Sequence, residues 1–558
     1  MNSARQSSAP TILSTATQHL SKSVSVAAVF FLLFAIHFPY HYGLRYLPLF
    51  ESLTIALVDA VIFTTIVWIT TRLDLARVTL CFLALPYLIF FPGWLNTPAA
   101  VTLLIIFIYC ITNTLRTTTS TSHSSITLHD LLAFVLIIIW VNLSGAGGYG
   151  HQTPDYGVHN ARLKDLVDYS WPVHYGENQN FVSYFGYFLP AAIIGKLSNA
   201  DFAFRSMYPW TILGVTLVLR WLSFLSGWRF SALLVSVFIF FGPIDILNVF
   251  ALGYHADIPL DSAFAETLVN SDYLDFRTRY DIGFIIGNYL SNTFQLFWSP
   301  HQVIAGWLCI GLMTHLYLQK QTTHFVFTYA LLCLWSPLIM IALLPFVFVA
   351  VLPPLFSKKS GAVVTIENLL GAGAVSAVFV AFYLAGSPQS IPSPFILSGF
   401  DWKNQGWVLA LFYFSAWGAY IAMLKPFIAR QEPEKKIWFI CLAIVLFVLP
   451  LKKFGAYSDL LCRGSAPLMF LLLIFILQAI GQYWRRQHGV LLVLLLGLLV
   501  LGAGSSLLQL RHAFNRYGTK PVTASIVHYA YAEENLGPDN TFFNRALRHK
   551  PSDVKPAK

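Results

Sequence analysis

The sequence predicts an all-α polytopic membrane protein, and three observations support that fold class. First, 56% of the 558 residues are hydrophobic and only 11% are charged, whereas an average soluble domain is roughly 25% charged. Second, apolar runs long enough to cross a hydrocarbon layer of roughly 30 Å recur from Val24 to Leu508. Third, short polar connections separate the runs. Because backbone groups in lipid must be bonded within their own segment, each run is predicted to be a helix.

The chain divides into a tail of residues 1–23, a membrane domain of residues 24–510 and a tail of residues 511–558. The first apolar run lacks a small-residue cleavage site, so we expect a retained span rather than a removed signal. By length we expect about fifteen spans. They are residues 26–41, 52–70, 76–91, 99–115, 131–145, 207–225, 230–251, 303–318, 325–335, 338–356, 363–384, 406–424, 437–451, 467–483 and 490–508.

Basic residues predict the orientation, because they collect in cytoplasmic loops. They recur in alternate connections, at Lys22, Arg72, Arg77, Arg116, Arg229, Lys320, Lys358, Lys359, Lys425 to Lys436, Arg485 and Arg486. This alternation requires that residues 181–197 do not cross, and we expect an interfacial helix there. The N-terminal tail is then cytoplasmic, while the loops 146–206 and 252–300 and the C-terminal tail are exoplasmic. That tail is too short for a separate domain, and its end, residues 549–558, is expected to be disordered.

The formal net charge of +10 does not indicate nucleic acid here, because the positive-inside rule accounts for the basic loops. The six cysteines are scattered and mostly intramembrane, so they predict neither a zinc site nor a disulfide framework.

The segment 145–172 is a polar island between apolar runs, and it carries Asp155. Before Asp155, residues 145–150 form a glycine-rich turn that lets the chain bend back to the membrane. The turn formally matches GxGxxG, but no βαβ unit surrounds it, so no nucleotide cofactor is expected. Asp155 is either a turn residue after Pro154 or a general base at the membrane surface.

Residues 159–169 have a helical pattern that would lie along the interface. Arg162 with Asp165, and Lys164 with Asp168, have the spacing of solvated surface pairs, and we prefer that reading for Lys164.

A second polar group lies where the loop 252–300 re-enters the membrane, and it consists of Asn292, Gln295, His301 and Gln302. His301 is equally well explained as a paired structural histidine. Upstream, an acidic run offers oxygen ligands for a divalent cation, although a solvated loop explains it better and the metal question stays open. The run contains Tyr254, His255, Asp257, Asp261 and Glu266.

A third group places cations on the exoplasmic side, where the positive-inside rule disfavours them. Its members are Lys452, Lys453, Tyr457, Asp459 and Arg463. Such cations suit a phosphate or pyrophosphate, although pairing with Asp459 or with lipid headgroups also explains them.

At these places the chain resembles integral-membrane glycosyltransferases of the GT-C superfamily, which includes lipid A aminoarabinose transferases and protein O-mannosyltransferases. The resemblance rests on the runs HNARLKDLVDYSWPV, YFGYFLPAAIIGKL, LFWSPHQVIAGWL and DLLCRGSAP. It implies a GT-C-like bundle with exoplasmic amphipathic helices and an inverting transferase of the bacterial inner membrane. The implied substrates are a polyprenyl-phosphate sugar donor and an envelope lipid, glycan or protein acceptor.

The resemblance also implies residue roles. Asp155 would be catalytic and would deprotonate or orient the acceptor, while Arg463 with Lys452 or Lys453 would hold the leaving phosphate. His159, Asn160 and His301 would bind sugar or acceptor. The chain departs from the superfamily pattern because Asp155 has no acidic neighbour and several spans precede its loop.

Two other functions stay open. A transporter or flippase of lipid-linked glycans would place paired charges within facing helices, and Asp245 and Glu367 are the main acidic residues in or near apolar runs. An O-antigen polymerase or ligase would also have many spans and an exoplasmic site of Arg and His, but its long loop usually comes late.

Overall fold

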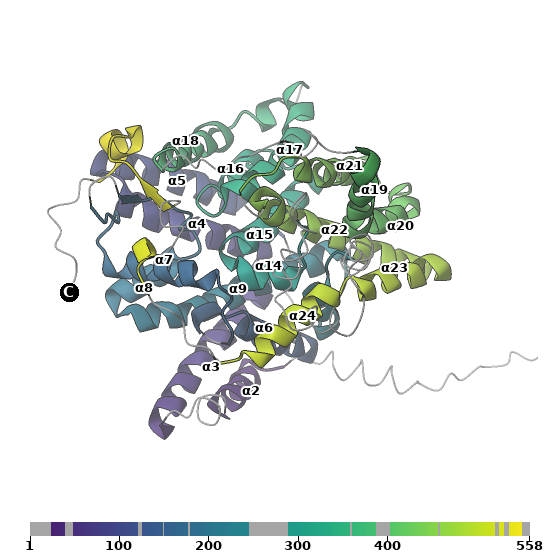
Figure 1. The fold of residues 1–558 in the computed structure, drawn as a ribbon, viewed down its shortest axis with the longest axis horizontal. Helices are drawn as coiled ribbons and strands as arrows, with labels where there is room; N and C mark the ends of the chain where they lie inside the picture. Colours follow the sequence, from purple (N-terminus) through teal and green to yellow (C-terminus); the bar gives the residue numbers. More distant parts are fainter. Residues whose placement is uncertain are drawn as a thin grey trace, which may run out of the picture.

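The structure is a computed structural model that describes residues 24–39, 48–120, 125–148, 150–176, 179–244, 288–357, 360–386, 395, 402–455, 458–518, 524–528 and 535–549. Helices make up nearly all of its regular structure (Figure 1). The sheet in this part of the chain has two short antiparallel strands, β1 (Asn180–Phe181) and β2 (Leu536–Gly537).

The first half of the chain forms membrane helices with two shorter helices between them. In order they are α2 (Val26–Pro39), α3 (Leu49–Arg72), α4 (Leu75–Trp94), α5 (Thr97–Thr117), α6 (Leu128–Leu143), the 3-10 turn η2 (Ala146–Gly148), α7 (Tyr156–Asp168), α8 (Leu189–Leu197), α9 (Ala200–Ser226) and α10 (Ala232–Phe240).

The second half continues the bundle and ends in short segments. Its elements are α14 (Asn292–Trp298), α15 (Pro300–Leu318), α16 (Phe325–Ala330), α17 (Pro337–Leu355), η3 (Ser360–Ala362), η4 (Glu367–Gly371), α18 (Ala372–Tyr383), α19 (Trp402–Tyr413), η5 (Phe414–Gly418), α20 (Ala419–Ile428), α21 (Pro433–Val448), η6 (Leu449–Leu451), α22 (Asp459–Arg485), α23 (Gly489–Leu501), α24 (Gly504–Asn515), η7 (Ile526–His528) and η9 (Phe543–Leu547).

Capping residues set several helix starts. The side chains of Asp74 and Asn96 accept hydrogen bonds from the first turns of α4 and α5, which satisfies amide groups that no helical carbonyl can reach. At α6, Thr127 and Asp130 form a reciprocal capping box. The start of α17 has Pro337 in its first turn, where a missing amide hydrogen costs nothing.

Eight described helices are long and apolar enough to cross a membrane, which confirms an all-α polytopic membrane protein. They are Leu49–Arg72, Leu75–Trp94, Thr97–Thr117, Ala200–Ser226, Pro337–Leu355, Leu409–Ile428, Asp459–Arg485 and Gly489–Asn515. Three shorter apolar helices accompany them: Val26–Phe38, Leu128–Leu143 and Glu367–Tyr383. The count of fifteen spans and the assignment of sides stay predictions.

Some expected elements differ in length. In the expected span 230–251, of which residues 245–251 lie outside the described residues, helix α10 ends at Phe240, and residues 241–244 are not helical, because the residue before Pro243 is disfavoured in the helical region. The expected span 325–335 is helical only over α16 and then continues in turns. Conversely, α22 begins at Asp459 rather than near residue 467.

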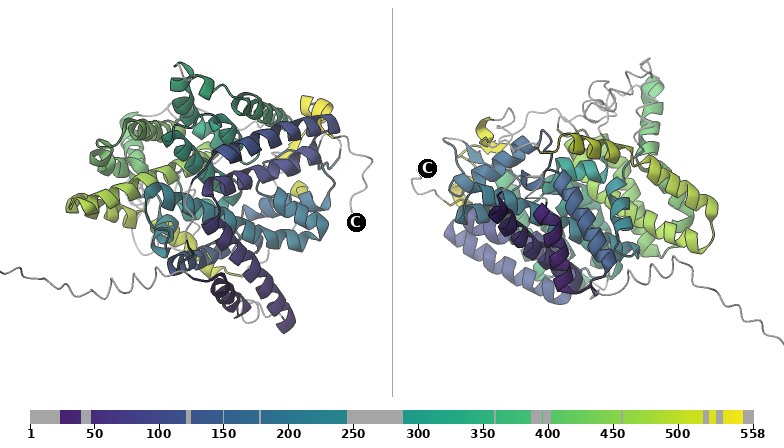
Figure 2. Two further views of the ribbon diagram at one scale, coloured as in Figure 1. Left: turned by 180° about the vertical axis from the view of Figure 1, so that it is seen from behind. Right: turned by 90° about the horizontal axis from the view of Figure 1, so that it is seen from below.

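Helix α22 lies at the centre of the bundle, where it contacts α9, α14, α15, α17, α20, α21 and α23. Most of its length is buried. The views from behind and from below show the helices packed side by side in one bundle (Figure 2). The central position means that residues on α22 are fixed by packing on several sides.

Contacts between helix ends define two ends of the bundle. At one, which we call the basic end, the amide of Ala76 bonds Ser120, and Lys320 pairs with Glu434. At the other, which we call the site end, α7 and α8 pack against each other and α24 packs on α14. Helix α8, within the expected interfacial segment 181–197, has nine residues, which is too short to cross a bilayer, and its position at the interface stays a prediction.

Candidate functional site

The glycine-rich turn after α6 has backbone conformations that only glycine adopts easily. Gly145, Gly147, Gly148 and Gly150 all have positive φ. A Cβ added at Gly150 would lie 2.2 Å from the carbonyl oxygen of Asn142. The turn therefore folds tightly over the end of α6 and delivers Asp155 to the start of α7.

Asp155 occupies the residue before α7, yet its side chain makes no capping hydrogen bond. Its Oδ2 lies 3.7 Å from a terminal guanidinium nitrogen of Arg463, and 39% of the Asp155 side chain is exposed. A turn role would direct the carboxylate to nearby backbone amides. The observed geometry instead pairs it with a cation 308 residues later in the sequence (463 − 155).

Arg463 points from the second turn of α22, and Asp459 stands one turn before it on the same helix. The backbone amide of Asp459 donates to the carbonyl of Phe454 at 2.6 Å. Gly455 has φ +79°, and a Cβ there would lie 1.9 Å from the Asp459 carboxylate. This tight turn fixes where α22 begins, and so it sets the position of Arg463.

The electrostatics of Asp155 combine opposing effects. Burial raises the pKa of its carboxyl, the Arg463 guanidinium opposes that rise, and the nearby Asp459 carboxylate adds to it. The pKa of Asp155 is raised from its ordinary value as a result. A carboxylate with a raised pKa is a stronger base than an ordinary surface aspartate.

Two buried histidines lie next to this ion pair. His159 is one helical turn after Asp155, and its ring centroid lies 4.4 Å from that of His301. The Nε2 atom of His159 lies 3.0 Å from the carbonyl oxygen of Trp298, so this nitrogen carries the hydrogen. Burial, aided by Arg162, lowers the pKa of His159 to about 3 and keeps the ring neutral.

His301 has the opposite hydrogen-bonding arrangement. Ser336 donates to the Oε1 of Gln302, and the Nε2 of Gln302 lies 3.0 Å from the Nε2 of His301. The histidine nitrogen therefore accepts, and its Nδ1 carries the hydrogen. Both Nδ1 atoms are buried, and neither has a hydrogen-bond partner among the described residues. One accepts and the other donates, which matches the two roles of a hydroxyl group.

Arg162 is not the solvated partner of Asp165 that its spacing suggested. It is buried, and it donates to the side-chain oxygen of Asn535 at 3.0 Å. Its guanidinium lies over the ring of Tyr184, 5.4 Å from the centroid. The Tyr184 ring in turn stacks on His301. Arg162 therefore extends the site toward the C-terminal segment. Lys164, by contrast, pairs with Asp168 in a partly exposed position, as expected.

The C-terminal segment packs over α7, which sequence reasoning missed. The Oδ2 of Asp165 accepts bonds from the Tyr175 hydroxyl, the Ser525 hydroxyl and the Ile526 amide, at 2.6, 3.0 and 2.8 Å. Strand β2 pairs with β1. Ser525 and Ile526 lie 360 and 361 residues after Asp165 in the sequence, and no residue pattern in the tail indicates these contacts.

Several predicted binding residues take other positions. Asn160 is paired with the amide of Gln152. The buried amides of Asn292 and Gln295 donate to the carbonyls of Phe238 and Cys462 at 3.0 and 2.5 Å, so both link helices.

Of the two expected phosphate lysines, Lys452 lies with its ammonium over the Phe395 ring, 4.5 Å from the centroid. No contact with Asp155 is described for Lys452 or Lys453 in the part of the chain that the structure covers. Tyr457 and the acidic run of Tyr254, His255, Asp257, Asp261 and Glu266 lie outside the described residues.

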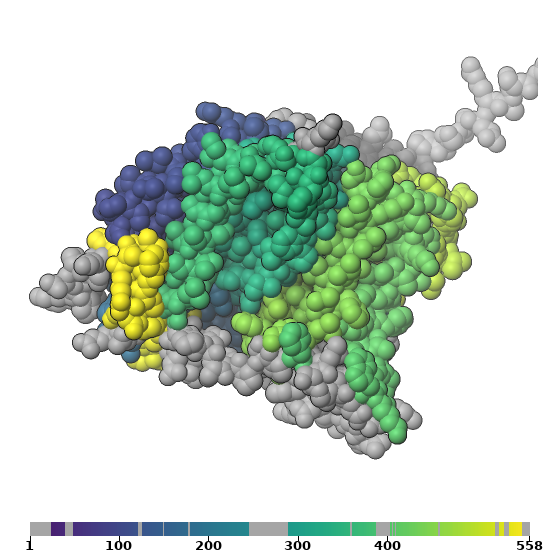
Figure 3. Space-filling model, turned by 90° about the horizontal axis from the view of Figure 1, so that it is seen from above, coloured from purple at the N-terminus to yellow at the C-terminus, as the bar shows by residue number. Residues whose placement is uncertain are grey.

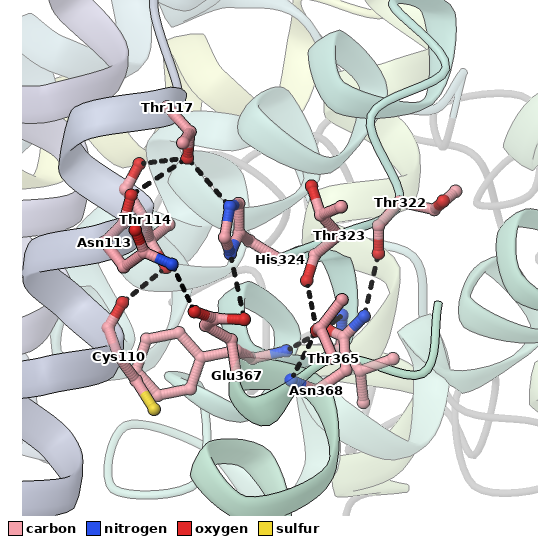
Figure 4. A network of polar contacts seen from close by, with 12 residues as sticks. Cys110, Asn113, Thr114, Thr117, Thr322, Thr323, His324, Thr365, Glu367 and Asn368 are labelled. Carbon is pink, nitrogen blue, oxygen red and sulfur yellow. Dashed lines mark hydrogen bonds and ion pairs between the residues drawn. The ribbon is translucent and has the colours of Figure 1, made fainter. Parts of the chain in front are cut away.

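A separate polar network lies near the basic end, and Figure 4 shows it. Glu367 accepts a hydrogen bond from Asn113 of α5, and its other oxygen lies 3.8 Å from His324. His324 in turn lies 2.7 Å from the hydroxyl of Thr117. Glu367 thus joins helix ends to each other. Asp245, the other acidic residue considered for transport, lies outside the described residues.

Among the described residues, no group of three or more His, Cys, Asp or Glu side chains could hold a metal ion. No family model and no curated protein matches this chain.

Proposed function

We propose that this protein is a membrane glycosyltransferase that moves a sugar from a polyprenyl-phosphate-linked donor to a lipid, glycan or protein acceptor of the cell envelope. The GT-C resemblance suggested this class. The observation that carries the proposal is the approach of Asp155 to Arg463 at 3.7 Å, beside two neutral histidines. In the predicted orientation these residues face the exoplasmic side of a bacterial inner membrane.

The chemistry needs few groups. The acceptor hydroxyl attacks the anomeric carbon, and the bond from that carbon to the phosphate oxygen breaks with its electron pair leaving on the phosphate. Asp155 accepts the hydroxyl proton, and its raised pKa favours that role. Arg463 stabilises the charge that develops on the departing phosphate, since a guanidinium binds phosphate oxygens through two parallel hydrogen bonds.

The two histidines would position a sugar or acceptor. Their unpaired Nδ1 atoms offer one acceptor and one donor in a buried setting. A ligand hydroxyl would satisfy both, and a ligand without it would leave two buried polar atoms unpaired, which costs roughly 1–3 kcal/mol each. Such a site selects a hydroxyl by hydrogen bonding rather than by charge.

The test is transfer from a panel of polyprenyl-phosphate sugars by purified protein in detergent, with envelope extract as acceptor. We expect Asp155→Asn to lower turnover by a factor on the order of 100 or more, as loss of a general base does. Asp168→Asn is the matched control, because Asp168 lies at the other end of α7, is similarly exposed and pairs with Lys164.

Equal turnover by wild type and Asp155→Asn would remove Asp155 from the mechanism. Transfer from a nucleotide sugar instead of the lipid-linked donors would overturn the donor class. Movement of an intact lipid-linked glycan across a liposome membrane, with no bond made, would favour the transporter alternative.

A further inference from the structure

Ser299 joins α14 to α15, and its side chain is used differently from those of three other serines that precede helices. Ser231, Ser291 and Ser336 each accept a hydrogen bond from the first turn of the helix that follows. Ser299 occupies the same position before α15, yet its side chain makes no capping bond. The residue has no exposed surface, and its hydroxyl oxygen has no hydrogen-bond partner among the described residues. Buried hydroxyls left in this way are rare in proteins and call for an explanation.

One turn earlier, Gln295 leaves a second hydrogen-bonding atom unused. The amide of Ser299 donates to the carbonyl of Gln295 at 2.9 Å, so the two residues stand one turn apart on the same side of α14. The Nε2 of Gln295 donates to the carbonyl of Cys462, the residue before Arg463. Its Oε1 is buried and has no partner in the part of the chain that the structure describes. Gln295 therefore faces the start of α22, beside the Asp155–Arg463 pair.

These two unpaired atoms belong to the same stretch of chain as the histidine pair. His301 follows Ser299 by two residues. His159 bonds the carbonyl of Trp298, the residue before Ser299, and its ring lies against that of His301. The unpaired atoms of Gln295, Ser299 and the two histidines thus gather at the junction of α14 and α15.

Together the four groups offer two donors and two acceptors. The Nδ1 of His301 and the hydroxyl of Ser299 donate, whereas the Nδ1 of His159 and the Oε1 of Gln295 accept. A hydroxyl group can donate one hydrogen bond and accept another, so two ligand hydroxyls satisfy all four groups. The four groups are uncharged, which suits a neutral sugar better than one that carries an amine or a carboxylate.

We propose that Ser299 is a specificity-determining residue, and that the site binds two neighbouring hydroxyls of a neutral sugar. The histidine pair binds one hydroxyl, and Ser299 with Gln295 binds the next. A sugar that lacks either hydroxyl leaves buried polar atoms unpaired, and a site of this kind rejects such an analogue strongly. The inference rests on the proposed function only where it identifies this sugar as the transferred group.

A ligand reaches these atoms only if part of the protein moves, since the four residues are at most 7% exposed. Helix α14 is packed among α10, α15, α22 and α24. Helix α7, which carries His159, is instead held from outside by the C-terminal segment, through the bond from Arg162 to Asn535. That segment, yellow in Figure 3, forms part of the outer surface beside α5. The sugar is therefore expected to enter on the α7 side.

The test measures binding in the absence of an acceptor, so that no transfer intervenes. The probes are glucosyl, galactosyl and mannosyl phosphates of a short prenol, together with derivatives of each that lack one ring hydroxyl. They are added to the purified protein in detergent, and the affinity is taken from the stabilisation against thermal unfolding as the probe concentration rises.

With the sugar that binds best, wild type should discriminate against two deoxy derivatives, and the missing hydroxyls should be neighbours on the ring. Each should bind more weakly by about tenfold or more, because two buried groups lose a partner. Ser299→Ala should lose the discrimination at one of these positions and keep it at the other. Ser299→Cys, which keeps the size of the side chain but replaces the hydroxyl by a weak donor, should show the same loss.

Ser415→Ala is the matched control, because Ser415 is a fully buried serine of η5 whose hydroxyl donates to the carbonyl of Phe412. It should keep both preferences and unfold at a lower temperature than wild type, since it loses a hydrogen bond. Ser299→Ala removes a hydroxyl that bonds no described residue. Without ligand it should therefore unfold no earlier than wild type, which a purely structural serine would not allow.

Equal discrimination by wild type and Ser299→Ala would overturn the proposal and leave an ordered water as the partner of the hydroxyl. Wild type that binds every deoxy derivative as well as the parent sugar would overturn it too. The two proposals fail separately. Binding that depends on Ser299, with no sugar transferred when acceptor is added, keeps this inference and loses the transferase. Sugar transfer with the same preferences in Ser299→Ala as in wild type does the reverse.

Discussion

Asp155 and Arg463 show how a residue gains a role through its neighbours. Asp155 begins a helix, where an aspartate commonly accepts a bond from the first turn. It makes no such bond, and Arg463 is the cation 3.7 Å away. A carboxylate that leaves a capping bond unmade while pairing with a distant arginine is arranged for something other than helix stability.

The raised pKa of Asp155 predicts a pH dependence. A general base works only when ionised, so turnover should fall as the pH decreases through the pKa of Asp155. The Asp459 carboxylate raises that pKa. Asp459→Asn removes the negative charge, so the acidic limb of the pH–rate profile should move to lower pH.

Rates of sugar transfer measured across the acidic range would check this shift. Asp168→Asn is the control. It removes a carboxylate of α7 that pairs with Lys164 and not with Arg463, so the acidic limb of its pH–rate profile should stay in place. A limb that does not move in Asp459→Asn, or that moves to higher pH, would contradict the electrostatic account.

At the scale of elements, the connection between α7 and the C-terminal segment depends on Asp165. One oxygen of this carboxylate accepts three hydrogen bonds, two of them from residues 525 and 526. Burial raises the pKa of Asp165, while the three donors act against that rise. The segment is therefore held to α7 by a carboxylate whose removal leaves several donors without an acceptor.

Asp165→Ala should lower the free energy of unfolding by about 1–3 kcal/mol, because buried donors lose their partner. It should also make residues 511–558 more sensitive to protease. Limited proteolysis with mass spectrometry, together with thermal unfolding in detergent, would measure both effects. Asp168→Ala, which removes a partly exposed pair, should change neither by much. Unchanged protease protection in Asp165→Ala would show that other contacts hold the segment.

The sequence predicted the presence of most membrane helices better than it predicted where each helix begins and ends. Apolar length predicted most membrane helices, because burial of the backbone in lipid leaves no other solution. It could not predict that α22 begins at Asp459, since that start depends on the turn at Gly455 and on packing against other helices. The connection between the expected spans 437–451 and 467–483 therefore contains the first two turns of the central helix.

At the scale of the whole molecule, the basic loops and the candidate site lie at opposite ends of the bundle. This arrangement predicts labelling from opposite sides of the membrane. Ser198→Cys, between α8 and α9, should react with a membrane-impermeant maleimide from the outside of intact cells. Arg486→Cys, at the end of α22, should react only after the membrane is opened.

Wild type is the control for background labelling, because five of the six native cysteines are buried. Labelling of both variants from the same side would contradict the two-ended arrangement. Labelling of Arg486→Cys alone in intact cells would keep the two ends but reverse the predicted orientation.

The sequence predicted the candidate site in part. Charged residues are rare in this chain, and for that reason Asp155 and Arg463 could be predicted as candidate site residues. The structure brings the two side chains together. The sequence did not indicate Asn535, Ser525 or Tyr184, because ordinary polar and aromatic residues carry no signal until folding makes them neighbours. Lys452 was expected at the phosphate, but its position over the Phe395 ring could be found only from the structure.

The central position of α22 also determines which part of the site can move when a substrate binds. Arg463 belongs to α22, which packs against many of the other described helices, so moving it would disturb the packing of much of the protein. Asp155 belongs to the short helix α7, which polar contacts with the C-terminal segment hold from outside. We therefore expect Arg463 to keep its position when substrate binds. Entry of a bulky glycan should instead displace α7, together with the C-terminal segment that packs over it.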